Sequence, residues 1–329
     1  MIAGEVGVVR SDGAALPVGR RRRAALHASR VRIALPVLLA ATLSACSTPA
    51  RSEDLTVAGA AIHVELAGDA PLAGEPVVLE WVRRSAGVVA QYYGQFPAPR
   101  LKLHIVIQGG AGVQGGKTFA NPDAFIRVNL GREATAAELS ADWVLVHEMT
   151  HLALPDTGEE HQWLSEGLAT YVEGVARVQT GNRTELDVWT EELRAMPRGL
   201  PQPGDQGLDR THTWGRTYWG GAMFSLLADV QIHQRTANRF GLQDALRAIL
   251  RASGGLSADW PIERVLRTGD AAVGTAVLEE LYAKYKDTPV SPDLMGLWQQ
   301  LGIEPEGSGV RLNDAAPLAE IRHAIMRPR

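Results

Sequence analysis

Two histidines and a glutamate carry the clearest chemistry in this chain of 329 residues. His147 and His151 are four positions apart, so in an α-helix they lie one turn apart on the same face. Glu166, on a following helix, can then close three corners of a tetrahedron around Zn²⁺. The fourth corner stays open for water, which is the arrangement of a catalytic rather than a structural zinc site. The sequence therefore predicts a zinc enzyme.

Two predicted helices must position these ligands. Thr135–Glu138 is a capping box, in which side chains at both ends satisfy otherwise unpaired backbone N–H groups. The helix that it opens is expected to carry both histidines and to end by Pro155. A second helix is expected over His161–Arg177, and it carries Glu166.

A small sheet is predicted ahead of the zinc helices. Leu101–Gln108 and Phe125–Leu130 alternate apolar and polar residues, as strands with one buried face do. Leu55–Leu66 also alternates, Pro76–Tyr93 has helical spacing, and Gly109–Gly116 is expected to be a loop. The rest of the chain has a mainly helical pattern. Further helices are expected at Arg183–Met196, Tyr218–Arg235, Leu242–Ala252, Pro261–Arg267, Ala271–Asp287 and Ala316–Met326.

Two segments of this sequence resemble a known clan of peptidases. WLSEGLATYVE (Trp163–Glu173) is similar to the zinc-ligand segment of the gluzincins, usually written WLNEGFAxYxE. Tyr218–Ala222 resembles the YxxGA segment of the same proteins. The matched region runs from about Trp143 to Asp229, and the likeness is greatest to the glycyl aminopeptidase-like and aminopeptidase N-like families. It implies an α+β fold: a thermolysin-like core with a small N-terminal mixed sheet and a helical C-terminal subdomain.

The resemblance also implies a division of roles in a zinc-dependent peptidase. His147, His151 and Glu166 would hold Zn²⁺, which lowers the pKa of a bound water towards about 7. Glu148 would act as the general base and pass the proton to the leaving amine. Tyr218 would stabilise the oxyanion, an effect worth on the order of 3–4 kcal/mol.

Three further residues each have two interpretations. Glu173 lies on the same helix face as Glu166, so it could orient a zinc-ligating histidine, or it could be a solvent-exposed carboxylate. His212 and Arg216 lie close to Tyr218 in the sequence. They could contact the substrate or the oxyanion, or they could only hydrogen-bond the backbone of a loop.

The expected substrates are peptides or proteins, but the position of cleavage stays open. In gluzincins an edge strand before the zinc helix pairs with an extended substrate, and Phe125–Leu130 is the expected strand here. The aminopeptidases bind the free substrate amine with a glutamate of a GxMEN-like motif, whereas Gly115–Asp123 of this chain contains no glutamate. An endopeptidase and an aminopeptidase are therefore both considered. A catalytically idle binding or scaffold lipoprotein is the third alternative, and the intact Glu148 counts against it.

The N-terminus predicts export and lipidation. An arginine-rich run precedes the apolar stretch Ile33–Leu43, which is too short to span a membrane and resembles a signal peptide. Leu43–Cys46 resembles a bacterial lipobox, and Cys46 is the single cysteine. An ordinary signal peptide with a chance cysteine is the alternative. Ser47 resembles the residue that sends lipoproteins to the outer membrane of diderm bacteria.

These observations give an expected organisation of the chain. A leader covers residues 1–45, a tether 46–54, a sheet and zinc-helix subdomain 55–200, and a helical subdomain 201–329. Residues 1–30 fit a signal poorly, and translation starting near Val31 would explain them. The lipid places the enzyme on a membrane face without placing it in the membrane. A net charge of −4 gives no reason to expect nucleic acid as a partner.

Overall fold

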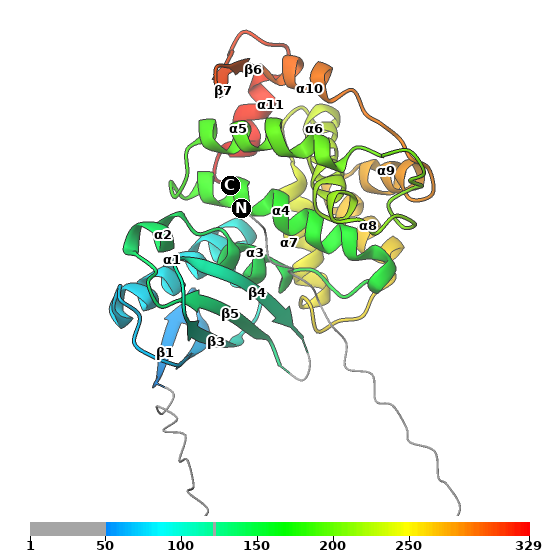
Figure 1. The fold of residues 1–329 in the computed structure, drawn as a ribbon. Helices are drawn as coiled ribbons and strands as arrows, with labels where there is room; N and C mark the ends of the chain where they lie inside the picture. Colours follow the sequence, from blue (N-terminus) through cyan, green and yellow to red (C-terminus); the bar gives the residue numbers. More distant parts are fainter. Residues whose placement is uncertain (1–50, 121–122) are drawn as a thin grey trace, which may run out of the picture.

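The computed structural model describes residues 51–120 and 123–329, which form a sheet covered by helices (Figure 1). The expected leader and Cys46 lie outside the described residues. The sheet consists of β1 (Arg51–Val57), β2 (Ala60–Ala67), β3 (Arg100–Gln108), β4 (Val113–Phe119) and β5 (Phe125–Gly131). The helices near it are α1 (Glu75–Tyr93), α2 (Ala136–Ala141), α3 (Val144–His151) and α4 (Gln162–Gln179).

The remainder of the chain is mainly helical, as expected. Its α-helices are α5 (Glu185–Ala195), α6 (Gly221–Thr236), α7 (Leu242–Ser253), α8 (Ile262–Val273), α9 (Val277–Tyr285), α10 (Leu294–Leu301) and α11 (Ala319–Met326). Short 3₁₀ turns η1 (Glu159–His161) and η2 (Met196–Gly199), a π-helical segment η3 (Gly215–Gly220) and the hairpin β6 (Ile303–Glu306) with β7 (Gly309–Leu312) complete it. The patterns did not predict α10 or this hairpin. No helix in the described part of the chain is long and apolar enough to span a membrane.

The sheet is mixed and its strands run in the order β1-β2-β3-β5-β4. Strand β3 pairs in parallel with β2 and β5, whereas β1 and β4 pair antiparallel with their neighbours. The expectation that Phe125–Leu130 is the edge strand is therefore wrong, because β5 lies between β3 and β4. The edge strand on this side of the sheet is β4, whose first residues belong to the segment expected to be a glycine-rich loop. Its pairing needs only backbone groups, which glycine also supplies.

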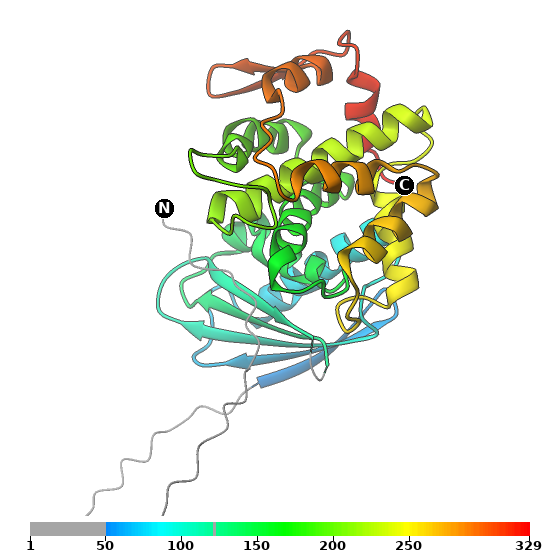
Figure 2. The same cartoon turned by 90° about the vertical axis from the view of Figure 1, so that its right-hand side faces the viewer.

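Among the described residues, helices cover one face of the sheet. Side chains that point to that face are buried at alternate positions of each inner strand, as the alternation of strand side chains requires. They include Ile62, Val64, Leu103, Ile105, Ile126 and Val128. Figure 2 shows all the helices on this side of the sheet.

The first predicted strand is two strands. Ala58 and Gly59 both have positive φ, at 48° and 83°, and they turn the chain back so that β1 pairs antiparallel with β2. Strand β1 also begins earlier than expected, at Arg51. The last four residues of the expected tether, 51–54, thus belong to the sheet.

The helix expected to run from Thr135 through both histidines is broken in two. The Thr135–Glu138 capping box is confirmed, but it opens only the short α2. The carboxylate of Asp142 then accepts hydrogen bonds from the backbone N–H groups of Val144 and Leu145, each at 3.1 Å. These are the bonds of a new helix start, and they allow α3 to take its own direction.

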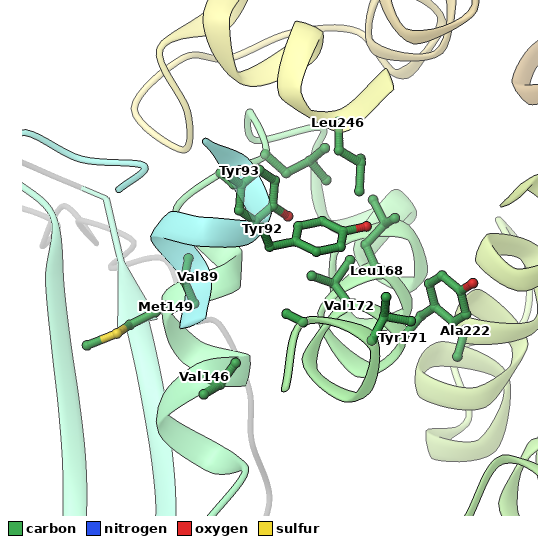
Figure 3. Close-up of a cluster of buried hydrophobic side chains, with 14 of the residues drawn as sticks. Val89, Tyr92, Tyr93, Val146, Met149, Leu168, Tyr171, Val172, Ala222 and Leu246 are labelled. Atoms are coloured by element: carbon green, nitrogen blue, oxygen red, sulfur yellow. The ribbon is translucent and has the colours of Figure 1, made fainter. Parts of the chain in front are cut away.

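The buried side chains form one cluster that joins the sheet side of the molecule to the C-terminal helices. Figure 3 shows Tyr92 of α1, Val146 of α3, Leu168 of α4, Ala222 of α6 and Leu246 of α7 in it. Because this core runs through both expected subdomains, the boundary at residue 200 stays a prediction.

Helices α4 and α6 touch through glycine. A Cβ atom on Gly167 would lie 2.2 Å from the Cα atom of Gly221, which only two glycines permit. The contact lies one residue beyond Glu166 on α4 and three residues beyond Tyr218. It therefore brings the segment that carries Tyr218 against the helix that carries Glu166.

Candidate metal centre

Helices α3 and α4 bring the three predicted ligands together. His147, His151 and Glu166 are all buried, and one ligand atom from each lies within 4.8 Å of the others. The Oε2 atom of Glu166 is 3.2 Å from Nε2 of His147 and 3.4 Å from Nε2 of His151. Glu166, fifteen positions after His151 in the chain, thus meets both histidines, because α4 folds back against α3.

These distances fit a tetrahedral zinc ion. Donor atoms that are each about 2.0–2.2 Å from one tetrahedral metal lie about 3.3–3.6 Å from one another. Among the described residues, Nε2 of His151 and Oε1 of Glu166 are buried without a hydrogen-bond partner. Leaving such groups unpaired costs about 1–3 kcal/mol each, and a bound cation would satisfy both. The donor set of two imidazoles and a carboxylate is also one that Zn²⁺ prefers.

The electrostatics favour an ionised ligand. Burial raises the pKa of Glu166, but His151 and His147 more than offset this and hold its pKa well below the usual range. Glu166 is therefore available as a carboxylate near neutral pH.

Residues around the ligands hold them in place. Nδ1 of His151 is 2.9 Å from the hydroxyl of Ser165, a contact that fixes the orientation of the ring.

Glu173 receives a 2.5 Å hydrogen bond from Arg177, which also donates to the Ala141 carbonyl at the end of α2. Among the hydrogen bonds of the described residues, none joins Glu173 to His147 or His151, as the prediction required. Glu173 is buried, which excludes the solvent-exposed alternative.

The predicted general base, Glu148, is buried beside the ligands. Its Oε2 atom accepts a 2.6 Å hydrogen bond from the hydroxyl of Thr118 on β4, whereas its buried Oε1 atom has no partner among the described residues. A Cβ atom on Gly116 would lie 2.6 Å from Cγ of Glu148, so the edge strand packs directly against this side chain. The sequence patterns did not indicate Thr118 or Gly116 as site residues.

Tyr218 lies near both carboxylates of the site. Its ring is stacked 6.3 Å from the ring of His147. Burial raises its pKa, and the negative charges of Glu166 and Glu148 raise it further, so the phenol keeps its proton. Tyr218 was expected to open a helix, but it lies in the π-helical segment η3 just before α6. Such wide turns are frequent at functional sites.

His212 and Arg216 have different surroundings. The guanidinium of Arg216 is buried and donates a 2.5 Å hydrogen bond to the carbonyl of Gly199, so it anchors η3 to η2. Burial lowers the pKa of Arg216, and Asp205 lies 4.0 Å from its Nε atom. This is the backbone-anchoring alternative for Arg216. His212 is exposed in the loop before η3.

The sequence matches no protein-family model and no curated protein. Its structure is similar to that of an aminopeptidase N family protein from Idiomarina loihiensis, with a TM-score of 0.62 and 14% identity over 77% of this chain and 49% of that one. It is also similar to a mutant M1 zinc metallopeptidase from Deinococcus radiodurans bound to a Tyr-Ser-Ala substrate, with a TM-score of 0.50 and 14% identity. That match covers 75% of this chain and 53% of the other.

The chain thus spans about half the length of these two structures. At such low identity the likeness concerns the fold alone. This chain shares with the M1 zinc metallopeptidases an N-terminal sheet followed by a helical region. The buried His147, His151 and Glu166 lie on helices α3 and α4 of this fold.

Proposed function

We propose that this chain is a zinc-dependent peptidase that uses Glu148 as its general base. The observation that carries the proposal is the convergence of His147, His151 and Glu166 beside an unpartnered carboxylate oxygen of Glu148. The fold likeness to M1 zinc metallopeptidases supports it. We also propose that the part of the fold that holds these residues is a thermolysin-like core.

The side chains divide the proton transfers between them. When bound, Zn²⁺ would activate a water molecule and polarise the scissile carbonyl. Glu148 accepts the proton of the attacking water at Oε1, because Oε2 is held by Thr118. Glu148 then passes this proton to the leaving amine. Tyr218 donates its phenolic hydrogen to the developing oxyanion.

The edge of the sheet fits an extended peptide. Among the described strands, β4 pairs only with β5, so its other edge offers backbone N–H and C=O groups for a further strand. Gly116 brings this edge against Glu148. A peptide paired with β4 would run past the general base, which favours peptides or proteins as substrates.

The site of cleavage along the peptide separates two versions of this proposal. The β4 segment Val113–Phe119 contains no carboxylate that could bind a free amine, which favours an endopeptidase. Peptides with blocked and free N-termini test this, because an aminopeptidase loses activity on the blocked ones. Turnover confined to free N-termini would establish the aminopeptidase.

Glu148→Gln tests the chemistry itself. We expect the wild-type protein to contain stoichiometric zinc and to cleave members of a mixed peptide library. Glu148→Gln should keep the zinc and lose cleavage, while Glu159→Gln, which changes an exposed carboxylate on η1, should change neither. Unchanged cleavage by Glu148→Gln would refute the mechanism. A wild-type protein that binds zinc and cleaves nothing would instead support the idle binding or scaffold lipoprotein.

We also propose that Cys46 carries the lipid that anchors the enzyme at the cell envelope, at the outer membrane in a diderm host. The lipobox-like residues Leu43–Cys46 support this. Growth with a labelled fatty acid should label the wild-type protein and not Cys46→Ser. Equal labelling of the two proteins, or of neither, would overturn the anchor.

A further inference from the structure

Two tryptophans at the metal site are exposed. The described residues include five exposed large hydrophobic side chains, and two of these, Trp143 and Trp214, contact residues of the site. Trp143 is 44% exposed and Trp214 is 50% exposed. An indole contributes to folding through burial, so half-exposed indoles grouped at one place indicate a binding surface.

The two indoles end a row of four rings. The ring of Trp143 lies edge-on to that of His147 at 5.6 Å, and His147 is followed by Tyr218 at 6.3 Å. Tyr218 in turn stacks with Trp214 at 5.9 Å. The inner two rings belong to the proposed metal ligand and the proposed oxyanion donor. Each tryptophan therefore lies directly beside the reacting groups, one at either end.

A hollow adjoins Trp143. The indole forms part of the wall of a pocket of about 430 Å³ between the α2–α3 junction and the start of α5. The charged groups of this wall already have partners: Arg177 pairs with Glu173, Arg183 pairs with Glu191 at 2.7 Å, and Asp187 accepts a hydrogen bond from the hydroxyl of Thr184. Trp143 is the one aromatic side chain of this wall, and its exposed indole offers a ligand a flat apolar face.

We propose that Trp143 and Trp214 are side-chain subsites at the two ends of the catalytic site. They select peptides with bulky apolar or aromatic residues flanking the scissile bond. Aromatic faces bind such side chains by burial and by offset or edge contacts. This inference rests on the proposed peptidase function and specifies its substrate class.

Peptide series that differ only beside the scissile bond test the subsites. We expect the wild-type protein to cleave phenylalanine-flanked peptides with at least about tenfold higher kcat/KM than alanine-flanked ones. Trp143→Ala and Trp214→Ala should each remove this preference on one side of the bond, mainly through KM. Trp143→Phe and Trp214→Phe should restore most of it. Met295→Ala, which changes an exposed apolar side chain on α10, should leave the preference intact.

Binding to an inactive variant separates this inference from the proposed chemistry. Fluorescence polarisation of a labelled phenylalanine-rich peptide on Glu148→Gln gives affinity without turnover. Adding Trp143→Ala or Trp214→Ala should weaken this binding at least about tenfold. If the wild-type protein cleaves peptides without apolar preference, the subsites are refuted and the peptidase stands. If it cleaves nothing but this affinity loss is found, the subsites stand and the peptidase is refuted.

Discussion

The hydroxyl of Thr118, on the edge strand β4, lies 2.6 Å from Oε2 of Glu148 and 2.8 Å from the backbone carbonyl of the same residue. Thr118 is buried, and thirty positions separate the two residues in the chain. The hydroxyl carries one hydrogen, so it can donate to one of these oxygens at a time. The contact leaves Oε1 as the oxygen free to accept a proton. The contact connects β4, the strand proposed to bind the substrate, with Glu148, the proposed general base.

Removing this hydroxyl should slow catalysis without loss of the metal. We expect Thr118→Val to lower kcat about tenfold with little change in KM, because Glu148 loses the contact that fixes its carboxylate. Thr118→Ser keeps the hydroxyl and should retain most of kcat. Steady-state kinetics and zinc content measure both effects. Equal losses in Thr118→Val and Thr118→Ser would assign the effect to packing instead.

Tyr218→Phe should lower kcat by about 10²–10³-fold while KM and zinc content change little, because removal of one oxyanion donor has effects of this size. The phenylalanine ring keeps the stacking with His147 and Trp214. The prediction is checked by kinetics on one peptide substrate together with metal analysis. A variant with wild-type kcat would show that Tyr218 does not donate in the transition state.

The site residues that lie close together in the sequence were predictable from their spacing. His147 and His151 lie on one helical turn, and Glu166 lies in a segment with its own recognisable pattern. Thr118 and Ser165 could not be predicted in the same way. Their contacts depend on how β4 packs on α3 and how α4 folds back, and neither arrangement is encoded in a short stretch of sequence.

The fold shows the same division. The alternation in Leu101–Gln108 predicted β3 because its period of two matches one buried face. The place of β5 in the sheet depends on strand order, which alternation does not encode, so its assignment as the edge strand was wrong. The break before α3 depends on the Asp142 carboxylate, which the apolar pattern of the helix did not reveal.

Metal removal should lower the thermal stability. The buried Oε1 of Glu166 has no hydrogen-bond partner among the described residues, and Nε2 of His151 has only the Glu166 carboxylate at 3.4 Å, so their desolvation is incompletely compensated without a cation. A ligand that binds the native state stabilises it by about 2.7 kcal/mol at one hundred times its Kd. We expect a chelator to lower the Tm by several degrees and added Zn²⁺ to restore it.

His151→Ala provides the matched comparison for this measurement. Its Tm should respond little to either the chelator or Zn²⁺, because the variant lacks one of the three ligands. If the wild-type Tm is also insensitive to both, these residues do not form a metal site.

A buried carboxyl that is not one of the metal ligands should make the stability depend on pH. Glu192 on α5 is buried, and Glu191, Glu173 and Arg183 are the charged groups around it. Burial, followed by the charges of Glu191 and Glu173, raises the pKa of Glu192 from 4.5 to about 8, although Arg183 opposes this. Near neutral pH the group is therefore protonated in the folded protein and ionised in the unfolded chain.

The sign of the resulting pH dependence follows from this difference. Between about pH 4.5 and 8 the unfolded chain releases the proton and the folded protein keeps it, so Glu192 lowers the stability as the pH rises. The loss is about 1.4 kcal/mol per pH unit over this range.

Glu192→Gln carries no charge in either state and removes the loss. Its free energy of unfolding, compared with that of the wild-type protein, should therefore gain several kcal/mol from pH 5 to pH 8. Urea denaturation at both pH values measures this gain, and Glu159→Gln, which changes an exposed carboxylate on η1, should not show it. Because each variant is compared with the wild type at the same pH, titration of the metal ligands cancels. A difference between Glu192→Gln and wild type that stays constant with pH would mean that Glu192 is ionised in the folded protein.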